Sequence, residues 1–101
     1  MPLIEILIVG TNQPIMGTIE RLINKEGIWK ATIALSTEEA MRLAKSNLFN
    51  IVLLCAGIPE ELDLKEKLAA IYPKLPIVKH YGGGSGLLFA EIHQALTTNQ
   101  H

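Results

Sequence analysis

The sequence predicts a three-layer α/β/α domain whose sheet has four parallel strands. Two nearly continuous apolar runs, residues 4–9 and 51–56, end at turn-forming glycines, which is typical of strands buried on both faces. Segments with apolar residues at helical spacing follow each predicted strand, so strands and helices alternate along the chain. Because each parallel strand requires a crossover connection, this alternation predicts helices on both faces of the sheet.

Length and composition place the chain among small cytoplasmic domains. Its 101 residues suit a single domain, residues 1–101, with a core over about 3–96 and a polar tail at 97–101. The net charge is −1 and the basic residues are scattered, which argues against nucleic-acid partners. No apolar run is long enough to cross a membrane, and the start lacks the basic stretch of a signal peptide. The one cysteine excludes an internal disulfide.

The first strand, 4–9, leads into a helix that begins near Pro14 because proline suits the first helical turn. Asn12 or Gln13 is the expected cap, and Gly27 is expected to close the helix with a positive φ. The apolar stripe predicted for this helix is Ile15, Ile19, Leu22 and Ile23.

The second strand, predicted over Trp29–Leu35, alternates less cleanly and is placed near the edge of the sheet. Ser36 and Glu39 have the spacing of a capping box, which predicts a helix over Thr37–Ser46. Its inward residues are expected to be Ala40, Leu43 and Ala44.

After the third strand, Glu60 and Glu61 fall in the expected first turn of a helix that Pro73 ends. Glu61 and Lys65 are spaced for an ion pair along that helix. The inward stripe predicted here is Leu64, Leu68 and either Ile71 or Tyr72.

The fourth strand is predicted over Pro76–Tyr81, with proline tolerated at its first position. A glycine-rich loop then leads to a last helix over about Ser85–Leu96. The apolar face of that helix is predicted to be Leu88, Ile92, Ala95 and Leu96.

Four segments, in order, carry a family resemblance: the first strand followed by Gly10-Thr11-Asn12-Gln13, the helix start at 36–41, the segment Cys55-Ala56-Gly57-Ile58-Pro59, and the strand at 76–81. Together they make the chain resemble the receiver domain of two-component response regulators. The resemblance implies a flavodoxin-like fold with strand order 2-1-3-4. It also implies that the family's fourth helix and fifth strand are missing from this shorter chain.

The resemblance also locates a degenerate phosphorylation pocket. Gly10 and Thr11 stand where receivers have an acidic pair, Cys55 stands at the phospho-accepting aspartate, and Tyr81 stands at a threonine or serine. Phosphoryl transfer to a carboxylate needs Mg²⁺, which prefers oxygen ligands. We therefore expect a pseudo-receiver that is not phosphorylated, has no metal, cofactor or enzyme activity, and acts in signalling through protein–protein contacts.

An alternative function is binding of an anion or nucleotide at the carboxyl ends of the strands. Asn12 and the loop formed by Gly82, Gly83, Gly84 and Ser85 are the residues expected to form such a site, because glycine-rich loops at helix starts present N–H groups to anions. The loop lacks the spacing and the lysine of a P-loop, so a flexible connection capped by Ser85 is the simpler interpretation.

Cys55 has two interpretations, a reactive thiol or a small buried apolar side chain, and we favour the second. His80 and Tyr81 follow it at the end of the neighbouring strand and are interpreted as structural rather than as acid–base groups. His93, between polar neighbours on the last helix, is expected to be solvated.

Loss of a fifth strand leaves the strand at 76–81 as an edge, and an open edge invites pairing with another chain. Loss of a helix is also expected to bare apolar surface nearby. We therefore expect a homodimer through the fourth strand, the glycine loop and the last helix, formed by edge pairing or by exchange of that helix.

Overall fold

The fold was analysed in a computed structural model that describes residues 4–25, 27–55, 57–80 and 85–98. Strands and helices alternate in the predicted order and pair into one parallel sheet of order β2-β1-β3-β4. The elements are β1 Ile4–Val9, α1 Gln13–Asn24, β2 Trp29–Ala34, α2 Thr37–Ser46, β3 Ile51–Cys55, α3 Glu61–Ile71, β4 Ile77–His80 and α4 Ser85–Thr98. The predicted fold class and strand order are thus confirmed.

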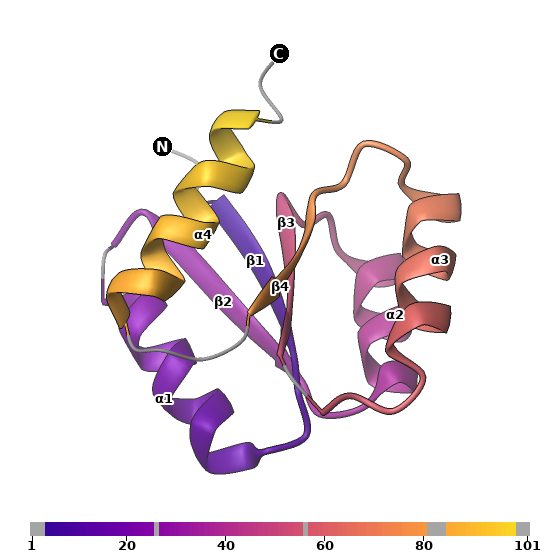
Figure 1. The fold of residues 1–101 in the computed structure, drawn as a ribbon, viewed down its shortest axis with the longest axis horizontal. Coiled ribbons are helices and arrows are strands. Elements are labelled where there is room, and N and C mark those ends of the chain that lie inside the picture. The colour runs from indigo at the N-terminus through magenta and orange to yellow at the C-terminus, as the bar shows by residue number, and fades with distance from the viewer. Residues whose placement is uncertain (1–3, 26, 56, 81–84, 99–101) are drawn as a thin grey trace.

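The sheet lies between two pairs of helices, with α1 and α4 on one face and α2 and α3 on the other (Figure 1). Because successive residues of a strand point to opposite faces, each strand contributes to both cores. Ile6 and Ile8 of β1 join the core under α1 and α4, whereas Leu7 and Val9 join the core under α2 and α3. All residues of β3 are buried, as predicted for a strand covered on both sides.

Helix α1 begins as the sequence predicts. The Asn12 side chain accepts a hydrogen bond from the Ile15 N–H at 3.2 Å, and Pro14 lies in the first turn. Gly27, just beyond the helix, has φ +75°, a conformation that side chains other than glycine rarely adopt.

The predicted apolar stripe of α1 is partly wrong. Ile15 is 52% exposed, whereas the side chain of Met16 is 1% exposed. The buried stripe runs through Met16, Ile19 and Ile23, at positions i, i+3 and i+7, and so is turned slightly from the predicted one. Met16 is thereby directed at the sheet near the end of β1.

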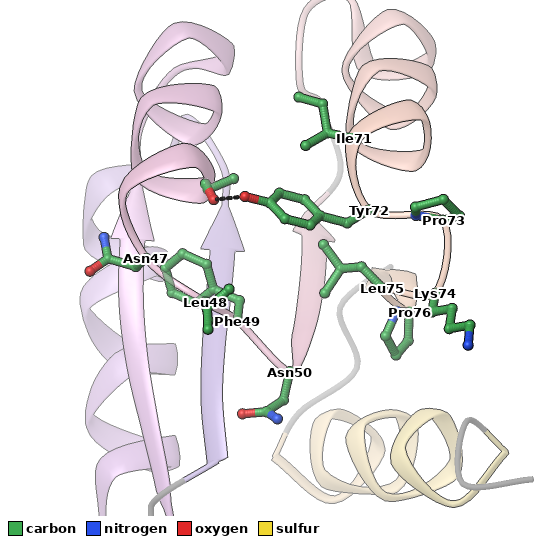
Figure 2. A pocket seen from close by; sticks show the side chains of 11 residues that line it. Asn47, Leu48, Phe49, Asn50, Ile71, Tyr72, Pro73, Lys74, Leu75 and Pro76 are labelled. Atoms are coloured by element: carbon green, nitrogen blue, oxygen red, sulfur yellow. Dashed lines mark hydrogen bonds between the residues drawn. The ribbon is translucent and has the colours of Figure 1, made fainter.

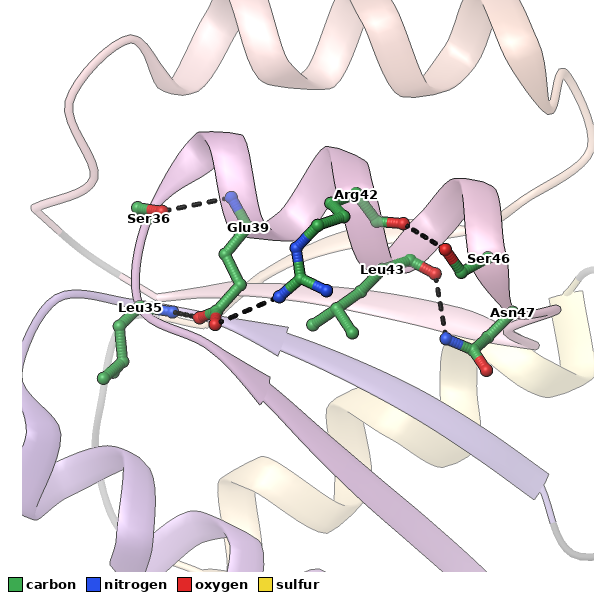
Figure 3. Close-up of polar contacts among 7 residues, drawn as sticks. All are labelled: Leu35, Ser36, Glu39, Arg42, Leu43, Ser46 and Asn47. Carbon is green, nitrogen blue, oxygen red and sulfur yellow. Dashed lines mark hydrogen bonds and ion pairs between the residues drawn. The ribbon is translucent and has the colours of Figure 1, made fainter.

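Helix α2 is capped by the predicted pair, but with a shifted partner (Figure 3). The Ser36 hydroxyl accepts from the Glu39 N–H at 3.1 Å, and the Glu39 carboxylate accepts from the Leu35 N–H at 2.8 Å. A standard capping box would use the N–H of Ser36 instead. Because the Leu35 N–H is bound by this carboxylate, β2 ends at Ala34, one residue earlier than predicted.

The ion pair predicted for helix α3 is wrong. Glu61 does not pair with Lys65 along the helix but with Lys79 on β4. Leu64 and Leu68 are buried as predicted. At the end of the helix Ile71 is 42% exposed, so Tyr72 completes the stripe instead, packed against the core under α2 and α3.

Strand β4 is confirmed over Ile77–His80, while the predicted end at Tyr81 falls outside the described residues. Ile77 and Val78 are half-buried, each packed against one of the two cores. The expectation of bared apolar surface here is not met: the large apolar side chains exposed in the described part of the chain lie on other elements and are Ile15, Ile28, Leu35, Leu48, Leu62 and Ile71.

Helix α4 buries Leu88 and Ile92 against the sheet, as predicted. Trp29, at the start of β2, is 2% exposed and lies 5.6 Å from Phe89 between ring centroids. His93 is exposed as predicted, but its ring also lies 4.9 Å from that of Trp29. Among the described helices, none combines the length and apolar character needed to cross a bilayer.

Candidate functional site

The carboxyl ends of the strands bring several predicted site residues together. Gly10 follows β1 and donates its N–H to the Ala34 carbonyl at 3.1 Å, and Cys55 ends β3. Cys55 is paired in register with His80, so both side chains project to the face covered by α1 and α4. Thr11 is exposed at the same edge of the sheet. The remaining predicted pocket residue, Tyr81, lies outside the described residues.

Met16 fills the space above Gly10. A Cβ placed on Gly10 would lie 2.7 Å from both Sδ and Cε of Met16, and 3.2 Å from Cβ of Cys55. Such distances are well inside van der Waals contact, so the Met16 thioether occupies the volume into which a side chain at position 10 would project. The region next to Cys55 is therefore packed with apolar atoms. Sequence reasoning missed Met16 because Ile15, one residue earlier, fits the helical period equally well.

Cys55 is 7% exposed and has no disulfide partner. Burial raises the pKa of its thiol from 9.0 to about 11; the Glu91 carboxylate adds to this rise, and the Lys79 ammonium opposes it. With that pKa, only about one thiol in ten thousand is ionised at pH 7. Because the thiolate is the reactive form, this supports interpretation of Cys55 as a packed apolar side chain.

His80 and Glu91 form a buried polar pair at this edge. The His80 Nδ1 lies 2.5 Å from the Glu91 carboxylate, with the side chains 9% and 16% exposed. Since Glu91 is on α4, the pair joins that helix to the end of β4. This agrees with the structural interpretation of His80. The partner was missed because a single acidic residue on an amphipathic helix carries no signal of what it faces.

On the opposite face of the same strand, Lys79 forms the ion pair with Glu61 at the start of α3. This ion pair joins the start of α3 to the end of β4. Within the described residues no group of three or more histidine, cysteine or acidic side chains is placed to hold a metal ion.

Only some residues of the alternative anion site are among those that the structure describes. The carbonyl oxygen of the Asn12 side chain is already used as the cap of α1. Helix α4 begins at Ser85, whereas Gly82, Gly83 and Gly84 lie outside the described residues. An anion site at this loop stays a prediction.

Comparison with solved structures shows which known fold the chain has. No known sequence family matches the chain, and no curated protein matches it either. Among solved structures, a CheY-like response regulator receiver domain protein from Methanospirillum hungatei has a TM-score of 0.85 and 20% identity, over 98% of each chain. The chain has the receiver-domain fold. At this level of identity the likeness establishes the fold rather than the activity.

Two further structures show the range of proteins with this receiver fold. Response regulator protein TrrA from Thermotoga maritima, solved in complex with Mg²⁺-BeF, has a TM-score of 0.83 and 16% identity, over 93% of this chain and 100% of that chain. A structure described as adenylate cyclase from Rhodopirellula baltica has a TM-score of 0.82 and 16% identity, over 97% of this chain and 90% of that chain. Most of the similar structures are described as receiver domains or response regulators.

Proposed function

We propose that the chain is a receiver-like module of two-component signalling that is not phosphorylated and acts in the cytoplasm through protein–protein contacts. The proposal does not assign it an enzyme activity, a metal or a cofactor. The observation that carries it is the packing of Met16 into the space above Gly10, in the same core cluster as Cys55.

The chemistry of the residues present supports this proposal. Mg²⁺ is held by hard oxygen ligands, mostly carboxylates and water. Positions 10, 11 and 55 supply a glycine, a threonine and a buried thiol. The side chain that packs above Gly10 is the thioether of Met16. Sulfur ligands select softer metals than Mg²⁺, and an apolar filling excludes the water that would complete its shell. Without the ion, the side chains at positions 10, 11 and 55 would not offset the charge of a transferring phosphoryl group.

Incubation with acetyl phosphate and Mg²⁺, followed by intact mass spectrometry, tests the loss of phosphorylation. We expect the mass of the chain to stay unchanged, because no carboxylate lies at position 55 to accept the group. The Thermotoga maritima protein, treated in parallel, controls for the phosphoryl donor. A stable gain of one phosphoryl group on this chain would contradict the proposal.

The protein–protein contact we propose is a homodimer through β4. Among the strands that the structure describes, β4 is at the edge of the sheet and pairs with β3 alone. The Val52 N–H donates to the Pro76 carbonyl at 2.9 Å. Because alternate residues of a parallel strand face the same neighbour, the backbone groups of Ile77 face the open edge. An unpaired edge of this kind is a template for pairing with a second chain.

Light scattering on Ile77→Pro and on the native chain tests edge pairing. Proline removes the Ile77 N–H but leaves the ladder to β3, so the variant is expected to fold and to be a monomer. The native chain is expected to be a dimer at high micromolar concentration. A native monomer under these conditions, or a dimer that survives the proline, would exclude edge pairing through β4.

A further inference from the structure

A second site lies at the opposite, amino edge of the sheet. A pocket of about 480 Å³ opens between the C-terminal ends of α2 and α3 and the loops that lead into β3 and β4 (Figure 2). Its volume is within the range of pockets that bind small molecules. It is separate from the carboxyl edge, where the resemblance to receivers places the degenerate phosphorylation pocket.

The walls of this pocket are apolar and held in place. Phe49, Tyr72 and Leu75 pack against the core under α2 and α3. The Tyr72 hydroxyl donates to the Ala44 carbonyl at 2.8 Å, which fixes its ring between the two helix ends (Figure 2). At the mouth, Leu48 is 82% exposed and Ile71 is 42% exposed. Two large apolar side chains thus remain in water beside a preformed apolar pocket.

Two carbonyl oxygens near the end of α2 are already used as hydrogen-bond acceptors. The last carbonyls of α2 would otherwise favour a cation. The Leu43 carbonyl accepts from both the backbone and the side-chain amide of Asn47, at 3.0 and 3.2 Å. The Ala44 carbonyl accepts from Tyr72. The lining residues include no aspartate or glutamate.

Two of the polar side chains that line the pocket offer donors. The Asn50 amide oxygen accepts from the Glu5 N–H at 2.8 Å, so the amide NH₂ is left without a partner among the described residues. The Lys74 ammonium likewise has no ion pair in the described part of the chain. In Figure 2 both groups lie below the Tyr72 ring, with Leu75 and Pro76 between them. An apolar pocket with a cation and an amide donor at its rim complements an apolar molecule with a negative head.

We propose that this pocket binds a small amphiphilic carboxylate, with its hydrocarbon part against Leu48, Phe49 and Leu75 and its carboxylate toward Lys74 and Asn50. The hydrocarbon part would cover the apolar side chains now in water, and the ammonium would form a charge-assisted hydrogen bond with the head group. This inference goes beyond the proposed function and does not depend on it.

Titration with octanoate, followed by the backbone amide signals, tests the site. We expect saturable shifts at Leu48, Tyr72 and Leu75 below about 10 mM, the weak range reached by small ligands. Octanamide has the same chain without the charge, and octylamine has the opposite charge. Octanoate is expected to bind several-fold more tightly than octanamide, and octylamine most weakly.

Matched variants locate the contacts. Lys74→Gln is expected to weaken octanoate binding about threefold to fivefold, as for an exposed charge pair, with Lys65→Gln unchanged. Leu48→Ala is expected to weaken octanoate and octanamide alike, with the similarly exposed Leu62→Ala unchanged. Dispersed amide spectra confirm that each variant is folded. The proposal is overturned by the absence of shifts at the pocket, by equal binding of octanoate and octylamine, or by insensitivity to both pocket variants.

Discussion

Replacing Met16 with alanine is expected to lower the free energy of unfolding by about 2–4 kcal/mol. The side chain is 1% exposed, packs above Gly10 and belongs to the same core cluster as Cys55, so its removal leaves a cavity in that core. Urea unfolding followed by circular dichroism measures the change. Leu68→Ala is the control, because it removes a fully buried side chain from the core on the other face of the sheet. We expect it to lower the free energy of unfolding by a similar amount.

The same substitution is also expected to expose the thiol of Cys55. Burial is the main reason that the pKa of this thiol is about 11, so hydration through the new cavity moves the pKa back toward 9.0. The rate of Cys55 alkylation in the native chain should rise about tenfold per pH unit until the pH nears that higher pKa. In the Met16→Ala variant the alkylation rate should level off nearer pH 9. At pH 8 this variant should react faster than Leu68→Ala. Equal rates in the two variants would show that Met16 does not shield Cys55.

Replacing Glu91 with alanine is expected to cost about 1–3 kcal/mol, because it leaves the buried His80 Nδ1 without its partner. The pair joins α4 to β4, so amide hydrogen exchange should accelerate first in α4. Urea unfolding and exchange of the same samples measure both effects.

The conservative variant Glu91→Gln controls for size and shape. Its amide oxygen still accepts a hydrogen bond from Nδ1, so its loss of stability should be clearly smaller than that of the alanine variant. A cost below about 0.5 kcal/mol for Glu91→Ala would contradict the importance of the pair, since that is the range of ordinary surface changes.

The backbone architecture could be predicted from the sequence because it rests on local signals. Apolar runs ended by Gly10 and Gly57 predicted strands buried on both faces, and the Asn12 and Ser36 caps marked two helix starts. These features act over a few residues, so their physical basis is present in the sequence itself. Strand order then followed from the resemblance to receivers.

The site could be predicted only in part because its contacts join distant segments. Lys65 lies one helical turn from Glu61, yet Glu61 pairs with Lys79 across to β4. The burial of Met16 rather than Ile15 depends on a small rotation of α1 that periodicity does not resolve. The glycine at position 10 was recognised as a missing acid, but not as the position above which a thioether packs.

Titration with Mg²⁺ and beryllofluoride, followed by the amide signals of Gly10, Thr11 and Cys55, tests the account most directly. The Thermotoga maritima protein, which has been solved in complex with Mg²⁺-BeF, is the positive control. Because Met16 fills the space above Gly10 and positions 10, 11 and 55 carry no carboxylate, these signals are expected to stay in place at every concentration. Saturable shifts that require both the metal and the fluoride would show that the carboxyl edge still holds a working phosphoryl site.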